Sequence, residues 1–121
     1  MAKHKMIIVA THATDDAERA TIPFVMANAA LAIDMDVTVV LQAEGVRLAI
    51  KDYARKIQAQ AFPPLHELMD GFGHGGGTIM VCVPCLRARN IDERQVVEGI
   101  KLVAAGKVVA EIADSDSQLC Y

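Results

Sequence analysis

Short apolar runs that alternate with segments of helical spacing constrain the fold of this chain more than any other feature. A strand–helix–strand alternation calls for right-handed crossovers, which place neighbouring strands parallel in one sheet. The sequence therefore predicts an α/β fold, namely a three-layer α/β/α sandwich around a mainly parallel five-stranded sheet, in a single domain over residues 1–121. The expected strands are residues 6–10, 37–41, 79–81, 100–104 and 117–121.

The composition agrees with a sheet that is buried on both faces. Hydrophobic residues make up 53% of the chain, yet aromatic residues make up only 4%. The excess comes from aliphatic side chains, as is typical of parallel strands covered on both sides. The segment 24–33 is apolar on nearly every side of a helix. We expect one face of this helix to pack on the sheet and another to contact a neighbouring subunit.

Charge and hydropathy exclude several classes of partner. A net charge of −3 and a pI near 5.7 argue against nucleic acid or an anionic membrane as the main partner. No apolar run approaches the ~18 residues of a spanning helix. The run at 6–10 is also shorter than the roughly 7–15 residues of a signal-peptide core. Three cysteines without an export signal predict a cytoplasmic protein whose thiols do not form structural disulfides.

Local signals suggest where the helices begin and end. Asp15 followed by Glu18 fits a capping box, and Pro23 then either separates a short turn from a helix or bends one helix. Apolar residues recur at helical spacing over 46–57. Asp92 is suited to cap a helix that continues to residue 97. The glycine-rich segment 71–77 precedes a strand and lacks the Lys-Ser/Thr of a phosphate loop, so we interpret it as a flexible connector.

The segment that follows the third strand carries the most chemistry. Cys82 comes directly after the apolar strand, Cys85 follows three residues later, and Arg87 and Arg89 come next. The free N–H groups at a helix start and two nearby guanidinium groups favour thiolate over thiol. The carboxyl end of a parallel strand is also where ligands bind in open α/β sheets. We predict a reactive cysteine at 82 with Cys85 as its neighbour, the alternative being two buried structural cysteines.

The loop after the first strand should open onto the same edge of the sheet. His12, Asp15 and Asp16 lie in this loop, so they are candidates to line the pocket of the thiol. A helix cap beside a solvated histidine explains the same residues equally well.

Two other kinds of cysteine site fit the sequence less well. The C-x-P-C spacing is used by dithiol oxidoreductases, but here it follows the third strand, and no proline lies beyond residue 84. A zinc site would need His12, His74 or Cys120 to join Cys82 and Cys85, and no second paired ligand motif exists. We therefore predict neither a metal nor a cofactor, and we expect Cys120 to serve packing.

The stretches THATDDAERATIPF, VTVVLQAEGV and VCVPCLRARNI resemble those of the DsrE/DsrF-like sulfur-relay family, and the likeness covers nearly the whole chain. The resemblance implies a small cytoplasmic α/β protein that forms trimers or hexamers. Several members of that family accept sulfur as a persulfide on a cysteine and pass it to a partner protein. That cysteine lies seven residues before a helical arginine, which corresponds to Cys82 relative to Arg89. Cys85 matches the C-x-x-C subset, and Asn90 stands where members usually have glycine.

Residues and resemblance together predict a sulfurtransferase-like carrier that takes sulfane sulfur on Cys82 from a donor protein and relays it to an acceptor. We expect a homotrimer or a homohexamer. A non-catalytic oligomeric scaffold with inert cysteines is the main alternative, and a dithiol oxidoreductase is another. The pH dependence of thiol labelling separates the first two, because an inert cysteine should titrate near the ordinary ~8.5.

Overall fold

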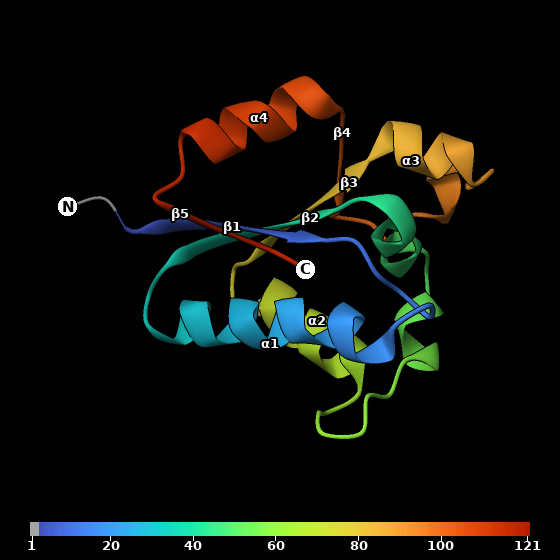
Figure 1. The fold of residues 1–121 in the computed structure, drawn as a ribbon, viewed down its shortest axis with the longest axis horizontal. Helices are drawn as coiled ribbons and strands as arrows, with labels where there is room; N and C mark the ends of the chain where they lie inside the picture. The colour runs from blue at the N-terminus through green and yellow to red at the C-terminus, as the bar shows by residue number, and fades with distance from the viewer. Residues whose placement is uncertain (1–2) are drawn as a thin grey trace.

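The computed structural model describes residues 3–121, in which strands and helices alternate along the chain (Figure 1). The strands are β1 (Lys5–Ala10), β2 (Asp36–Leu41), β3 (Thr78–Cys82), β4 (Lys101–Val103) and β5 (Ser117–Cys120). The α-helices are α1 (Ala17–Ala32), α2 (Leu65–His74), α3 (Val83–Ala88) and α4 (Ala105–Ala113). Three short 3-10 helices are η1 (Ala43–Ala49), η2 (Tyr53–Lys56) and η3 (Glu93–Gln95).

The five strands form one parallel sheet in the order β4-β3-β2-β1-β5. Helices α1 and α2 cover one face of the sheet and α4 covers the other, while α3 lies beyond the end of β3 (Figure 1). The predicted α/β/α architecture and parallel sheet are therefore confirmed. Because all strands run the same way, the loops after β1, β2 and β3 leave the sheet at one edge.

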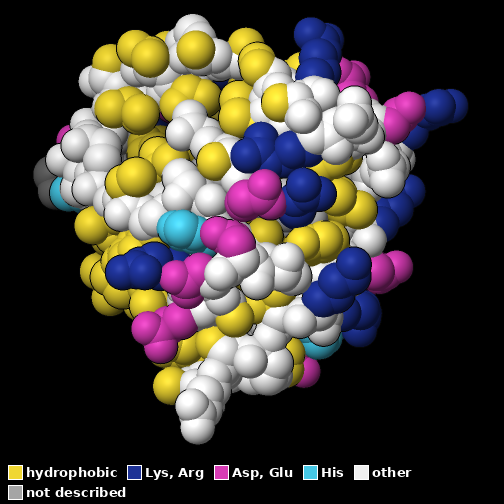
Figure 2. All heavy atoms as spheres, turned by 45° about the vertical axis from the view of Figure 1, so that its right-hand side comes forward, with side chains coloured by type: hydrophobic (Ala, Val, Ile, Leu, Met, Phe, Trp, Pro, Cys, Tyr) yellow, Lys and Arg dark blue, Asp and Glu magenta, His cyan; other side chains and the backbone are white. Residues whose placement is uncertain are grey.

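The apolar core lies in two layers of unequal size. The larger layer fills the space between the sheet and the helices α1 and α2, where the rings of Phe24 and Phe72 meet edge to face with centroids 5.9 Å apart. A smaller layer, which includes Ile7 and Val108, separates the sheet from α4. The outer side of α4 stays apolar, and Val109 is 64% exposed. Figure 2 shows hydrophobic side chains gathered on this upper part of the molecule.

Helix α1 is a single helix that continues through Pro23. Its N-cap is Asp16, whose side chain accepts the Arg19 N–H at 3.0 Å, so the capping box predicted from Asp15 and Glu18 does not form and the next residue caps the helix. The helix buries one side only, and Met26 on the other side is 40% exposed. A single chain therefore does not bury every side of α1.

The region 46–57 forms two 3-10 helices instead of the predicted α-helix. Asp52 adopts a left-handed backbone (φ 63°), which interrupts a helix. Ile50 is extended and pairs antiparallel with Val96, and the Lys51 N–H donates to the Gln95 carbonyl at 3.0 Å. The same pairing shortens the helix predicted from Asp92 to the single turn η3. A contact between distant segments thus overrides helical spacing on both sides.

The glycine-rich segment is more ordered than the predicted flexible connector, because α2 continues to His74. A Cβ added at Gly77 would lie 2.3 Å from the ring of Phe72. Glycine at this position therefore allows the backbone to pass close to a fully buried ring.

Candidate functional site

Cys82 ends β3 and is at the same time the N-cap residue of α3. Its extended backbone (φ −72°, ψ 113°) continues the strand, and Pro84 in the first turn suits a helix start. The side chain is half-buried against the edge of the larger core layer. The thiol is thus at the carboxyl edge of the sheet, where the sequence predicts it, and it is not sealed inside the protein.

Cys85 is one helical turn further on, near enough for its thiol to influence the pKa of the Cys82 thiol. The backbone N–H of Ala43, the first residue of η1, donates to the Cys85 Sγ at 3.4 Å. Both cysteines are free and half-buried. The two sulfur atoms therefore form one site, bounded by the β2–η1 loop.

The environment of Cys82 differs from the one predicted. Burial raises the pKa of the Cys82 thiol, and the neighbouring Cys85 thiol raises it further. The Cys85 N–H and the positive charge of Arg89 act in the opposite direction but are outweighed. The expectation that the pKa of Cys82 is lowered is therefore wrong for a single chain without a partner.

The ion pairs of Arg87 and Arg89 explain in part why the pKa of Cys82 is not lowered. The Arg89 Nε donates to Glu44 at 3.1 Å and its Nη1 donates to the Cys85 carbonyl at 3.2 Å. Glu44 also accepts from Arg47 at 2.6 Å, so one carboxylate bridges two guanidinium groups. Arg87 points to solvent, with its guanidinium 3.9 Å from Glu93. Acidic and basic side chains consequently lie side by side on this face of the molecule, as Figure 2 shows, and the positive charge that Arg87 and Arg89 are expected to provide near Cys82 is largely neutralised.

The loop after β1 forms a second polar group at the same edge. His12 Nδ1 and Asp15 Oδ2 are 2.7 Å apart, and the Ala13 N–H donates to the other Asp15 oxygen at 2.7 Å. Partial burial opposes ionisation of Asp15, but these two contacts outweigh it and lower the pKa of the carboxyl group. Asp16 is used as the cap of α1. Among residues 3–121, no hydrogen bond or ion pair joins His12, Asp15 or Asp16 to either cysteine of the site.

A close approach between two loops connects these groups. The Gln42 N–H donates to the Ala10 carbonyl at 3.0 Å. Gly45 packs so tightly against the end of β1 that a Cβ on it would lie 2.2 Å from the Ala10 oxygen. The end of β1 therefore touches the start of η1, which in turn contacts Cys85.

Cys120 does not belong to the site. It is exposed on β5, an outer strand three positions from β3 in the sheet order, and not packed as predicted. Three strand spacings amount to roughly 14 Å, which is too far for a disulfide to Cys82. Within the described residues, no three His, Cys, Asp or Glu side chains come together in a way that could hold a metal ion.

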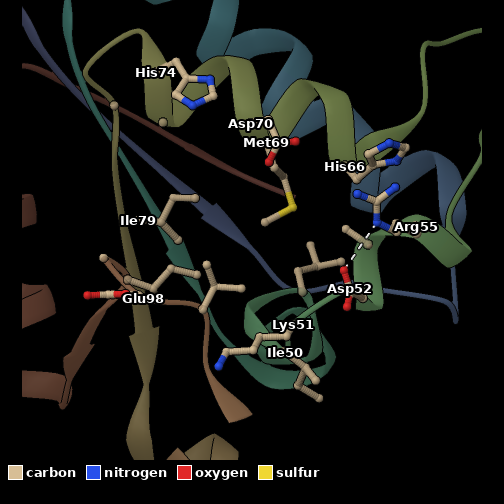
Figure 3. A pocket seen from close by; sticks show the side chains of 17 residues that line it. Ile50, Lys51, Asp52, Arg55, His66, Met69, Asp70, His74, Ile79 and Glu98 are labelled. Atoms are coloured by element: carbon tan, nitrogen blue, oxygen red, sulfur yellow. Dashed lines mark hydrogen bonds and ion pairs between the residues drawn. The ribbon is translucent and has the colours of Figure 1, made fainter. Parts of the chain in front are cut away.

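A cavity of about 600 Å³ on the α2 side of the sheet had no counterpart in the sequence prediction (Figure 3). Its lining combines apolar side chains such as Met69 and Ile79 with charged ones, and no cysteine contributes to it. His66 and Asp70 lie one turn apart on the wall formed by α2. The spacing of His66 and Asp70 is the one feature of the sequence that hints at this cavity. The opposite wall comes from segments far apart in the chain, and hydrophobic periodicity cannot show that they meet.

The fold and the site together define a class, which is a small parallel α/β protein with a Cys-X-X-Cys pair at the carboxyl edge of its sheet. The chain belongs to the DsrE/DsrF-like family, whose model matches residues 4–121. The resemblance of the loops and the cysteine segment is thereby confirmed at the level of the family.

Two relatives are uncharacterized proteins of Methanocaldococcus jannaschii. The protein MJ0760 is 32% identical over 101 residues, which make up 84% of this chain but only 37% of that protein. The chain thus spans little more than a third of the length of this relative. The protein MJ0989 is 28% identical over 117 residues, covering 97% of this chain and 99% of the relative.

Solved structures with the same fold are also similar to this chain. The crystal structure of the ychN protein from E. coli matches with a TM-score of 0.82 and 15% identity, over 98% of this chain and 99% of that one. A protein of unknown function from Methanobacterium thermoautotrophicum, MTH1491, matches with a TM-score of 0.78 and 16% identity over the same shares. At such identities the likeness shows the fold alone. Across residues 3–121, none of the helices combines the length and the apolar character needed to cross a membrane.

Proposed function

We propose that this protein carries sulfane sulfur as a persulfide on Cys82 and relays it to an acceptor protein. The observation that carries the proposal is the half-buried Cys82 at the carboxyl end of β3, with a second half-buried thiol one helical turn further on. Membership of the DsrE/DsrF-like family supports it further. A partly enclosed sulfur atom at a sheet edge can be reached by a donor while water is partly excluded from the bound persulfide.

The loading reaction is a displacement at sulfur. The Cys82 thiolate attacks the outer sulfur of a donor persulfide R–S–SH. A new S–S bond forms at Cys82, the S–S bond of the donor breaks, and R–S⁻ leaves with its electron pair. Transfer to the acceptor repeats the exchange, with an acceptor thiolate as the attacking group and Cys82 as the leaving thiolate. No cofactor is needed in either step.

The raised pKa of Cys82 has a consequence for this reaction. The thiolate is a minor form of Cys82 at neutral pH, so loading should be slow there and should accelerate as the pH rises. Ionisation of Cys82 therefore controls how fast the sulfur is loaded. A donor protein that covers the site and brings a cation close to it would favour the same ionisation.

The proposed partners are a sulfur donor protein and a sulfur acceptor protein in the cytoplasm. We also propose that the chain works as a homotrimer or a homohexamer. The exposed apolar side of α4 and the outer side of α1 support this, because Val109 and Met26 remain accessible in one chain. Light scattering on the purified protein measures the size of the assembly, and a monomer would contradict this part of the proposal.

The test compares single cysteine variants after treatment with inorganic polysulfide. Intact-mass spectrometry should show the gain of sulfur on a variant that keeps Cys82, and Cys82→Ser should abolish that gain. Cys120→Ser is the matched control, since it removes an exposed thiol outside the site and should leave uptake unchanged. Uptake by the Cys82→Ser variant equal to that of the unmodified protein would show that the sulfur acceptor is assigned to the wrong residue.

One observation favours the alternative of a scaffold with inert cysteines. The raised pKa at Cys82 is what a thiol without a chemical task would also show. The same experiment separates the two functions, because a scaffold would take up no sulfur in any variant at any pH at which it stays folded.

A further inference from the structure

A backbone donor from η1 is directed at Cys85. The Ala43 N–H donates to the Cys85 Sγ at 3.4 Å. A hydrogen bond from a backbone amide stabilises a sulfur anion more than a neutral thiol. The Cys85 sulfur therefore meets such a donor from outside its own helix.

The turn that provides this donor has a strained backbone and is held in place by contacts with the end of β1. Ala43 has a left-handed backbone (φ 50°), which is uncommon for a residue other than glycine, asparagine or aspartate. On one side the Gln42 N–H is bonded to the Ala10 carbonyl, and on the other Gly45 is wedged against the end of β1. These contacts fix the direction of the Ala43 N–H before any charge develops on sulfur.

The charged side chains around Cys85 are paired with one another. Arg89, on the same helix, donates to the Cys85 carbonyl, but its charge is shared with Glu44. Glu44 is in turn held by Arg47. The ion pairs thereby secure both the helix and the loop, so that the distance between the Ala43 N–H and the sulfur stays short.

We propose that Cys85 discharges the persulfide on Cys82, an inference that rests on the proposed function. The Cys85 thiolate attacks the inner sulfur of Cys82–S–SH. A bond forms between the two cysteine sulfurs, the bond to the outer sulfur breaks, and the outer sulfur leaves as HS⁻. Both cysteine thiols end as a disulfide, and the sulfane sulfur is reduced to sulfide. The step is balanced without any external oxidant or reductant.

The positions of the two cysteines suit this reaction. Cys82 is the N-cap of α3 and Cys85 lies in its first turn, and residues three apart at a helix start lie on the same side, so the two thiols are neighbours that can close a disulfide. An intramolecular attack has an effective concentration far above that of any free thiol in solution. The bound sulfur therefore has a limited lifetime: an acceptor takes it, or Cys85 releases it as sulfide.

The experiment loads the full-length protein and the variants Cys85→Ser, Cys85→Ala and Cys120→Ser with inorganic polysulfide, and removes the excess. Free sulfide and intact mass are then followed with time. The unmodified protein and Cys120→Ser should release one sulfide per chain and end two hydrogens lighter than the reduced form. Both Cys85 variants should keep the added sulfur. Their release of sulfide should be slower than that of the unmodified protein by a factor of at least about a hundred. Two variants are used so that a folding defect in one does not decide the result.

Equal release of sulfide by the Cys85 variants and the unmodified protein, after equal loading, would overturn this inference and leave the proposed function standing. A lack of loading in every protein would overturn both. Loading of Cys82→Ser to the same extent would also overturn both, because it would place the sulfur on another residue.

Discussion

Gly45 is the position where a single methyl group should disturb both the fold and the site. The residue is buried, and a Cβ added to it would lie 2.2 Å from the Ala10 oxygen, 2.9 Å from the Ala10 carbonyl carbon and 3.2 Å from the Thr11 Cα. All three atoms belong to the backbone at the end of β1. They cannot rotate away as a side chain would, so β1 or η1 has to move.

The expected cost follows from this geometry. Overpacking in a well-packed interior typically costs about 1–3 kcal/mol, and rigid backbone neighbours place Gly45→Ala near the upper end, at about 3 kcal/mol. Gly106→Ala is the matched control, because it adds the same methyl group in α4 with no atom within 4 Å. A helical Gly→Ala change without a clash should stabilise by about 0.5–1 kcal/mol.

Urea unfolding followed by circular dichroism measures both variants. With a slope of about 2 kcal/mol per M, Gly45→Ala should lower the midpoint by roughly 1.5 M, while Gly106→Ala should raise it slightly. A midpoint for Gly45→Ala within about 0.2 M of the unmodified protein would refute the argument that this glycine is required by the contact with Ala10.

Two further predictions concern pH. Because the pKa of Cys82 is raised, iodoacetamide labelling of Cys82 in the Cys85→Ser, Cys120→Ser double variant should be slow at neutral pH and should increase through a midpoint above the ordinary value; a midpoint below it would contradict the role assigned to burial. Glu111 is held by Lys5 at 2.8 Å and by Lys107 at 2.9 Å, which lowers its pKa to about 2. A carboxyl group with a lowered pKa stabilises the fold above its ordinary value near 4.5 and loses this contribution as the pH falls towards 2. Glu111→Gln should therefore cost roughly 1–2 kcal/mol at pH 7, allowing for solvent screening, and should flatten the acid limb of the stability curve; an unchanged acid limb would contradict the assignment.

The strands could be predicted from the sequence because their apolar runs are continuous and short. Both faces of β1 and β2 are covered by helices, so burial alone selects these residues. The region 46–57 could not be predicted in the same way, since its helical spacing competes with the pairing of Ile50 with Val96. Periodicity within one segment contains no information about a partner that lies far along the chain.

The location of the site was predictable, but its charge balance was not. A cysteine directly after an apolar strand must lie at the carboxyl edge, and Cys82 does. The partner that neutralises Arg89 is Glu44, 45 residues earlier in the chain, and only the folded structure brings them together. The backbone donor to Cys85 comes from Ala43, a residue whose side chain gives no sign of a role.

The most direct test of the account is to map the added sulfur to a residue. The protein variant Cys85→Ser is treated with inorganic polysulfide, alkylated and digested, and the peptide that contains Cys82 is analysed by tandem mass spectrometry. We expect one extra sulfur atom on Cys82, and none on Cys120. Extra sulfur on Cys120 alone, or no extra sulfur on any cysteine, would contradict the claim that Cys82, at the carboxyl end of β3, carries sulfur.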